Sequence, residues 1–283
     1  EHGVDRDGVG RFVCEALFTT VTNVSFDPAT TREKIGAALE LRDELKGLVA
    51  AKAGQEAAAF SHRSASWQGD AASYDAHAAE VGVLSIENED VRSLRELLIY
   101  GVKGIAAYAY HAAVPGKADA AVYDFFVEAL ASTTKDLNQD EMVGLVLKAG
   151  EIAVTTMAAL DAGNTEAYGH PELTAVRLGV GSKPGILISG HDLKDLEELL
   201  EQTKGTGVDV YTHGEMLPAH YYPAFKKYDN LVGNYGGAWY DQKSDFESFN
   251  GPILMTTNCI IPVKDAYKDR FYTTGPAAYP CTK

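Results

Sequence analysis

The hydrophobic pattern of this chain changes its period once, near residue 180. Before that point apolar residues recur every three or four positions, as Ile35, Leu39, Leu45 and Leu48 do, which predicts amphipathic helices. After it, short apolar runs of strand length alternate with helical stretches of about 10 to 15 residues, the pattern of an open parallel sheet. We therefore expect an α plus α/β chain, with a helical domain over residues 1–180 and an α/β domain over residues 181–283.

Individual elements follow from the same periodicity. Helices are predicted at residues 31–53, 90–113, 120–133, 139–161 and 192–203, with a loop and a shorter helix over residues 54–88. Strands are predicted at residues 185–189, 208–212, 231–233, 252–257 and 270–273. The string FVCEAL at residues 12–17 recurs as FFVEAL at residues 125–130. A duplicated helical bundle would produce this echo, and so would chance, because Glu-Ala-Leu is common in helices.

Composition narrows the class of partner. The chain has 40 acidic and 25 basic residues, a net charge of −15, and would repel nucleic-acid phosphates and anionic lipid. No run of about 18 apolar residues exists, since Lys103 and His111 interrupt the most apolar helix, so no membrane-spanning helix is expected. Cys14, Cys259 and Cys281 are odd in number and offer no disulfide framework. With no visible signal peptide, we expect a cytoplasmic protein that binds neither nucleic acid nor membrane.

Potential metal ligands follow three of the predicted strands. His191 follows the first strand, Glu215 the second and Cys259 the fourth, with Gly190 and Gly214 allowing sharp turns. Ligands of parallel α/β sheets bind outside the carboxyl ends of the strands, where these three side chains are expected to meet. Imidazole, carboxylate and thiolate are the common protein ligands of transition metals.

Ordinary roles compete with this interpretation on equal terms. His191 could lie beside a helix N-terminus, Glu215 could favour the start of the next helix, and Cys259 could be an inert buried thiol. If the site does bind metal, the residues alone favour zinc, because three protein ligands leave a fourth position open.

Other features flank these residues. His213 and His220 could orient ligands or serve an ordinary core or surface role. The glycine-rich segment 233–239 lacks a nucleotide-binding pattern and could let backbone approach a cofactor closely. Asn258, next to Cys259, is the expected catalytic residue, since it could donate a hydrogen bond to a bound substrate or to metal-cluster atoms.

Taken as whole strings, these motifs resemble the hybrid-cluster proteins, also called prismane proteins or hydroxylamine reductases. The resemblance spans nearly the whole chain and is least clear over residues 54–88. The strings that carry it are LISGHDLKDL at 187–196, YTHGEMLPAH at 211–220, VGNYG at 232–236, ILMTTNCI at 253–260 and LLIYGVKG at 97–104.

The resemblance implies a helical domain of two three-helix bundles, the first incomplete here, followed by a Rossmann-like α/β domain. It implies that His191, Glu215 and Cys259 are ligands of a hybrid iron–sulfur–oxygen (4Fe-2O-2S) cluster. The implied activity is reduction of hydroxylamine to ammonia and water, with nitric oxide as a further substrate and a reductase as electron donor.

The chain also departs from that family. Members begin with a cysteine cluster that holds a second 4Fe-4S or 2Fe-2S centre, which is absent here, and their last domain supplies further ligands. We therefore expect an internal fragment, lacking the N-terminal cysteine cluster and the C-terminal domain, and assign Cys281 no ligand role. Alternatives are a carbon monoxide dehydrogenase-like enzyme, against which the Glu215 motif argues, a non-catalytic scaffold fragment, and a mononuclear zinc hydrolase.

Overall fold

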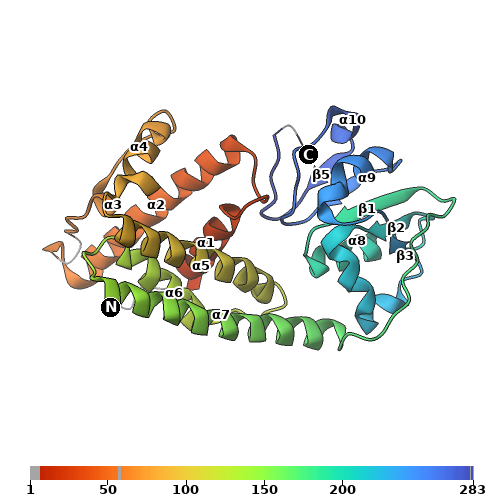
Figure 1. Ribbon diagram of the computed structural model, residues 1–283, viewed down its shortest axis with the longest axis horizontal. Coiled ribbons are helices and arrows are strands. Elements are labelled where there is room, and N and C mark those ends of the chain that lie inside the picture. The colour runs from red at the N-terminus through yellow and green to blue at the C-terminus, as the bar shows by residue number, and fades with distance from the viewer. Residues whose placement is uncertain (1–6, 57–58, 281, 283) are drawn as a thin grey trace. The chain divides into compact units, whose positions relative to one another are not determined.

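The computed structural model describes residues 7–56, 59–280 and 282. These residues form two compact units, drawn in Figure 1. The first comprises the chain up to Phe18 together with Pro28–Tyr110 and Asp119–Ala158. The second comprises Thr19–Asp27, His111–Ala118 and the chain from Ala159 onward.

Helices make up the first part of the chain. They are α1 (Asp7–Thr19), α2 (Pro28–Ala53), α3 (Arg63–Ser66), α4 (Tyr74–Val81), the 3₁₀ turn η2 (Val83–Ser85), α5 (Glu89–Ala113), α6 (Ala120–Ser132) and α7 (Gln139–Tyr168). The helices predicted at 31–53, 90–113, 120–133 and 139–161 are confirmed as α2, α5, α6 and α7.

Side-chain caps set where these helices begin. Asp119 accepts a hydrogen bond from the backbone N–H of Ala121 at 2.8 Å and so caps α6. Before α7, the Asn138 side chain accepts from the Glu141 N–H at 3.0 Å, and the Glu141 carboxylate accepts from the Asn138 N–H at 2.9 Å. This reciprocal pair satisfies N–H groups that a helix start leaves without a partner.

The core of the first unit lies between α1, α5, α6 and α7. It includes Val102 of α5, Phe125 and Phe126 of α6, and Cys14, whose thiol donates to the Ala106 carbonyl at 3.3 Å. By contrast, α2 buries no residue, although its periodicity predicts an amphipathic helix. The apolar side chains of α2 are therefore not part of this core.

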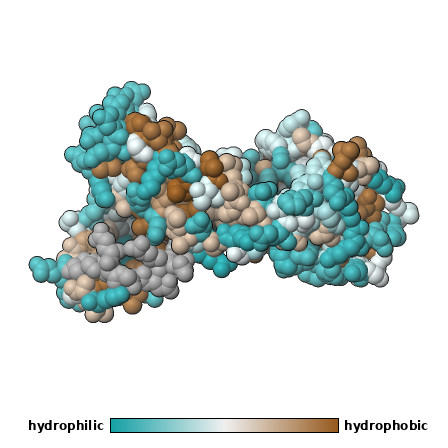
Figure 2. All heavy atoms as spheres, turned by 90° about the horizontal axis from the view of Figure 1, so that it is seen from below, coloured by the Kyte–Doolittle hydropathy of each residue, from teal (hydrophilic) through white to brown (hydrophobic). Residues whose placement is uncertain are grey.

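One helix, α7, is long and apolar enough to cross a membrane by length and composition alone. The expectation that composition excludes every such helix is therefore wrong, because the test tolerates a few polar residues within the apolar stretch. Core helices of soluble proteins pass the same test, so this one helix is weak evidence for a membrane. Met142, Ala149 and Thr156 of α7 are buried, whereas apolar patches reach the surface elsewhere on the helical unit (Figure 2).

The second unit is built on a five-stranded parallel sheet with the order β3-β2-β1-β4-β5. The strands are β1 (Gly185–Ser189), β2 (Asp209–Thr212), β3 (Leu231–Asn234), β4 (Ile253–Met255) and β5 (Phe271–Thr273). The connections contain α8 (Leu193–Thr203), η3 (Gly214–Tyr221), η4 (Pro223–Lys227), η5 (Trp239–Asp241), α9 (Gln242–Ser248) and α10 (Asp265–Lys268). All five predicted strands are confirmed.

Both faces of this sheet are covered, which explains why its strands are continuous apolar runs. Successive residues of a strand point to opposite faces. Leu187 packs with Phe246 on one face, and Ile188 packs with Leu196 on the other. In register, Leu187 of the central strand β1 lies opposite Tyr211 of β2 and opposite Ile253 of β4.

The helical part ends before the change in sequence period. Gly169, at φ +87°, follows α7, and the chain from there to β1 contains no helix. A left-handed glycine commonly ends a helix, and Pro171 cannot supply a helical N–H. The segment instead follows β3, where the Arg177 carbonyl accepts from the Asn234 N–H at 2.9 Å.

Candidate metal centre

Three adjacent strands carry the candidate ligands at one edge of the sheet. His191 lies just beyond β1, Glu215 just beyond β2 and Cys259 just beyond β4. Because β2, β1 and β4 are neighbours and all parallel, their carboxyl ends meet at the same edge. The fold therefore brings the three turns together in space, although they are far apart in sequence.

His191 has a nitrogen without a partner. Its Nδ1 atom is buried and makes no hydrogen bond within the described part of the chain. Burial lowers the pKa of His191, while the Glu215 carboxylate and a hydrogen bond with the Asn258 side chain oppose that shift. A neutral imidazole with an unsatisfied buried nitrogen suits a metal ligand, since coordination would supply the missing partner.

Cys259 sits on a strained backbone. Its φ of +69° is in the left-handed region, which costs a residue other than glycine about 1 kcal/mol or more. The Gln242 side chain donates to the Cys259 carbonyl, and the next N–H, of Ile260, donates to the Asn23 carbonyl at 3.0 Å. Burial, together with the Glu215 charge, raises the pKa of the Cys259 thiol to about 11. A nearby cation would be needed to make it a thiolate at neutral pH.

Glu215 is exposed and begins η3. Its carboxylate makes no hydrogen bond or ion pair with any described residue, but it is close enough to act electrostatically on both His191 and Cys259. In the described residues, no three His, Cys, Asp or Glu side chains form a group that could hold a metal ion. The three candidates are thus neighbours that do not converge on one ion position.

Two threonines after β4 hold the turn after β1. The Thr257 hydroxyl accepts from the His191 N–H at 3.0 Å and donates to the Asn258 side-chain oxygen at 3.1 Å. The Thr256 hydroxyl accepts from the Asp192 N–H at 3.2 Å. Gly190, at φ +104°, lies so close to Thr256 that a Cβ there would collide with its hydroxyl. The backbone of His191 is therefore fixed by hydrogen bonds that start on β4.

Comparison with known proteins agrees with this arrangement. Residues 1–283 match the Prismane/CO dehydrogenase family. The chain belongs to that family.

Proteins named hydroxylamine reductase share most of this prismane-family sequence. The protein from Nitratidesulfovibrio vulgaris is 58% identical over 95% of the chain, and that from Desulfosudis oleivorans is 58% identical over 98%. The protein from Chlorobaculum tepidum is 54% identical over 100% of the chain. The chain spans about half the length of the curated relatives it matches.

The sequence interpretation of this prismane-family chain missed His111. It lies in the last turn of α5, with its ring centroid 6.3 Å from that of His191. Burial, with a smaller contribution from His191, lowers the pKa of His111 to about 3. Its only signal in the sequence is a histidine within an otherwise apolar helix.

The histidines that flank Glu215 are both buried. His213 contacts Asp245 and Ser189, and His220 contacts the Thr212 hydroxyl at 2.9 Å. In the glycine-rich segment, the close approach at Gly236 is to the Asp245 side chain. These contacts lie within the protein itself.

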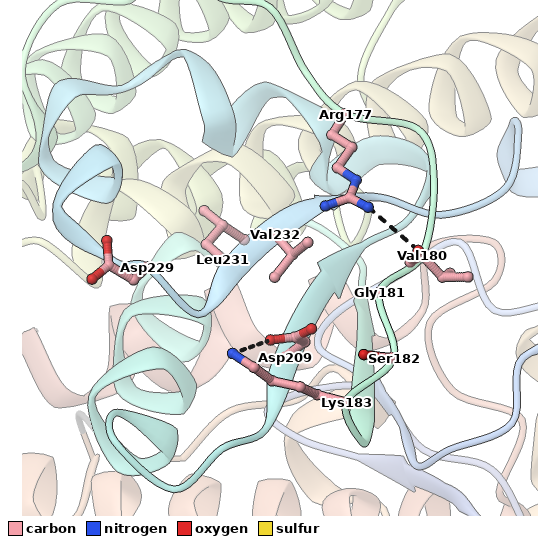
Figure 3. A pocket seen from close by; sticks show the side chains of 9 residues that line it. All are labelled: Arg177, Val180, Gly181, Ser182, Lys183, Asp209, Asp229, Leu231 and Val232. Atoms are coloured by element: carbon pink, nitrogen blue, oxygen red, sulfur yellow. Dashed lines mark hydrogen bonds and ion pairs between the residues drawn. The ribbon is translucent and has the colours of Figure 1, made fainter.

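A separate pocket of about 850 Å³ opens at the opposite edge of the sheet (Figure 3). It lies at the amino ends of the strands, where Lys183 and Asp209 form an ion pair at 3.5 Å. Arg177 faces the same pocket and donates to the Val180 carbonyl at 3.5 Å. None of the candidate ligands lines this pocket.

Proposed function

We propose that the protein containing this chain reduces hydroxylamine at a hybrid iron–sulfur–oxygen (4Fe-2O-2S) cluster held in part by His191, Glu215 and Cys259. The observation that carries the proposal is the buried, unpartnered Nδ1 of His191 beside a carboxylate and a thiol. Its support from relatives is their name, hydroxylamine reductase, at 54–58% identity.

The proposed reaction takes two electrons and two protons into hydroxylamine, breaks the N–O bond and releases ammonia and water. The electrons come from an electron-donating reductase, through a second 4Fe-4S or 2Fe-2S centre whose ligands lie outside this chain. When bound, the hybrid cluster supplies Lewis-acidic iron and the redox chemistry. Nitric oxide is a further substrate in this proposal, and the cytoplasm is the compartment.

The contribution of the chain is to hold and orient donors. His191 remains neutral through burial, and its backbone is tied to Thr257. The Asn258 side-chain oxygen takes the Thr257 hydroxyl proton, which leaves its NH₂ group free to donate towards a substrate. We assign Asn258 this role in orienting hydroxylamine.

The test uses the intact protein, purified and reconstituted without oxygen. Iron and acid-labile sulfide per chain are measured, together with ammonia formed from hydroxylamine and a reduced viologen dye. We expect several irons with sulfide and viologen-dependent ammonia formation. His191→Ala and Glu215→Ala should lose iron or change the visible spectrum, whereas His170→Ala, at an exposed histidine, should change neither.

Two results would contradict the proposal in different ways. If both ligand variants keep full iron and activity, the ligand assignment is wrong. If the intact protein binds no iron, or binds nickel and oxidises carbon monoxide without reducing hydroxylamine, the proposed activity is wrong.

A further inference from the structure

A buried line of three side chains connects two of the ligand-bearing turns. Ser189 is the last residue of β1, two positions before His191, and His213 lies two positions before Glu215. The Ser189 Oγ atom is 3.4 Å from His213 Nδ1 and 3.3 Å from the His213 carbonyl oxygen. On the other side of the ring, His213 Nε2 is 3.1 Å from an Asp245 carboxylate oxygen.

These contacts begin where the backbone ladder between β1 and β2 ends. The last registered pair is Ile188 with Thr212, and the final backbone bond runs from the His213 N–H to the Ile188 carbonyl at 3.0 Å. Beyond it, Ser189 and His213 continue the connection through side chains. The relative position of the two turns therefore depends on this contact.

The His213 ring has little freedom to move. It is fully buried, and the Phe246 ring meets it edge to face with centroids 5.0 Å apart. An ionised carboxylate can only accept hydrogen bonds, so Nε2 carries the proton and donates to Asp245, which leaves Nδ1 to accept. A ring flip would exchange these partners and lose the contact with Asp245.

Asp245 also anchors the glycine-rich segment. It is carried by α9, and one of its oxygens accepts from the Gly237 N–H at 3.0 Å. Gly236, at φ +75°, passes so close that a Cβ there would collide with the Asp245 carboxylate. One carboxylate thus fixes the histidine ring and the loop after β3 together.

The same residue types form the nucleophilic triad of many hydrolases, but this arrangement cannot act as one. In such triads the serine contacts Nε2 and the aspartate contacts Nδ1. Here the two contacts are reversed, and Ser189 is only 2% exposed, so no substrate carbonyl could reach its hydroxyl. The arrangement is suited to holding parts of the protein in place.

We propose that Ser189, His213 and Asp245 are positioning residues, which hold the His191 and Glu215 turns at the separation that lets both side chains bind one cluster. The proposal rests on the proposed function for the identity of that cluster. Partners that orient metal ligands from behind commonly change metal affinity by about 10- to 100-fold when they are removed.

The test compares variants of the intact protein, reconstituted without oxygen. Asp245→Ala removes the acceptor for His213, and Asp245→Asn keeps an acceptor oxygen of the same shape. The control is Glu80→Gln, which breaks another histidine–carboxylate contact, that of His77 with Glu80 at 3.2 Å, within α4. The measurements are iron retained against a chelator, the electron paramagnetic resonance spectrum, and the thermal midpoint of the iron-free protein.

We expect Asp245→Ala to lose iron at about tenfold less chelator than the parent protein, with an altered resonance spectrum. Asp245→Asn should restore most of both properties, and Glu80→Gln should match the parent. If Asp245→Ala retains iron and spectrum unchanged while the parent binds a cluster, the positioning proposal is wrong and the proposed function stands. If the parent itself binds no iron–sulfur cluster, the proposed function is what has failed.

A variant that does not fold would leave a second route. If the iron-free midpoint of Asp245→Ala collapses, Ser189→Ala decides, because it removes one hydroxyl and keeps the contact of His213 with Asp245. Weaker iron retention in Ser189→Ala supports the proposal. Unchanged retention and an unchanged spectrum in that variant overturn it.

Discussion

The hydroxyl of Thr257 accepts a hydrogen bond of 3.0 Å from the backbone N–H of His191. A residue that follows β4 thus fixes the turn that follows β1. We expect Thr257→Val, which keeps the shape and removes the hydroxyl, to lower the free energy of unfolding by about 1–3 kcal/mol, because it leaves this N–H without a partner. Urea denaturation of the iron-free intact protein measures the change. Thr257→Ser should lose much less, and equal losses in both variants would show that the hydroxyl is unimportant.

Gly190 is expected to tolerate no side chain. Its φ is +104°, and a Cβ would collide with Thr256. Gly205 is the matched control, since it has φ +75° with open space around it. Gly205→Ala should cost about 1–2 kcal/mol for the backbone conformation alone. Gly190→Ala should cost clearly more in thermal or urea unfolding, and a similar cost at both positions would argue against the close packing of β1 on Thr256.

Asp195 should make stability depend on pH. Burial, with the charges of Asp192 and Glu198, raises the pKa of Asp195 to about 7, while a hydrogen bond with Thr274 opposes the shift. A carboxyl with a raised folded-state pKa binds its proton more tightly when folded, so its contribution to stability is lost as pH rises from about 4 to about 7.

Asp195→Asn removes this penalty. We expect the variant to be more stable than the parent by about 1–3 kcal/mol at pH 8 and nearly unchanged at pH 4. Calorimetric midpoints of the iron-free protein at the two pH values test this. A gain of the same size at pH 4 would show that ionisation of Asp195 is not the cause.

Neighbouring residues of α6 should respond very differently to truncation. Phe126 is 0% exposed in the core of the first unit, whereas Val127 is 48% exposed. Phe126→Ala should cost about 3–5 kcal/mol through lost burial and the cavity left behind. Val127→Ala should cost much less. Similar midpoints for the two variants would contradict the orientation of α6.

The sheet could be predicted from sequence because its strands are short apolar runs separated by polar and glycine-rich segments. The juxtaposition of His191, Glu215 and Cys259 followed from one geometric fact, that parallel strands share an edge. The chain between α7 and β1 was harder to predict. There, Gly169 ends the helix, and tertiary hydrogen bonds with β3 determine the path that follows.

The partners of the candidate ligands could not be predicted in the same way. His111 comes from α5, and Asp245 comes from α9, and neither has a periodic or motif relationship to the strand ends. Ser189 stood inside a recognised string, but nothing in the sequence indicated that it contacts His213. Such pairs are determined by packing between distant segments, which a local pattern does not contain.

The strand order has a consequence for how the protein is made. Because β4 pairs with β1 and not with β3, the chain that leaves β3 must return past β2 and β1 before it can add β4. On the ribosome, the His191 and Glu215 turns emerge first, while Cys259 and the threonines that brace His191 emerge later. An assembly factor that delivers an inorganic group to this edge would therefore meet a sheet with β4 already in place, rather than a growing chain.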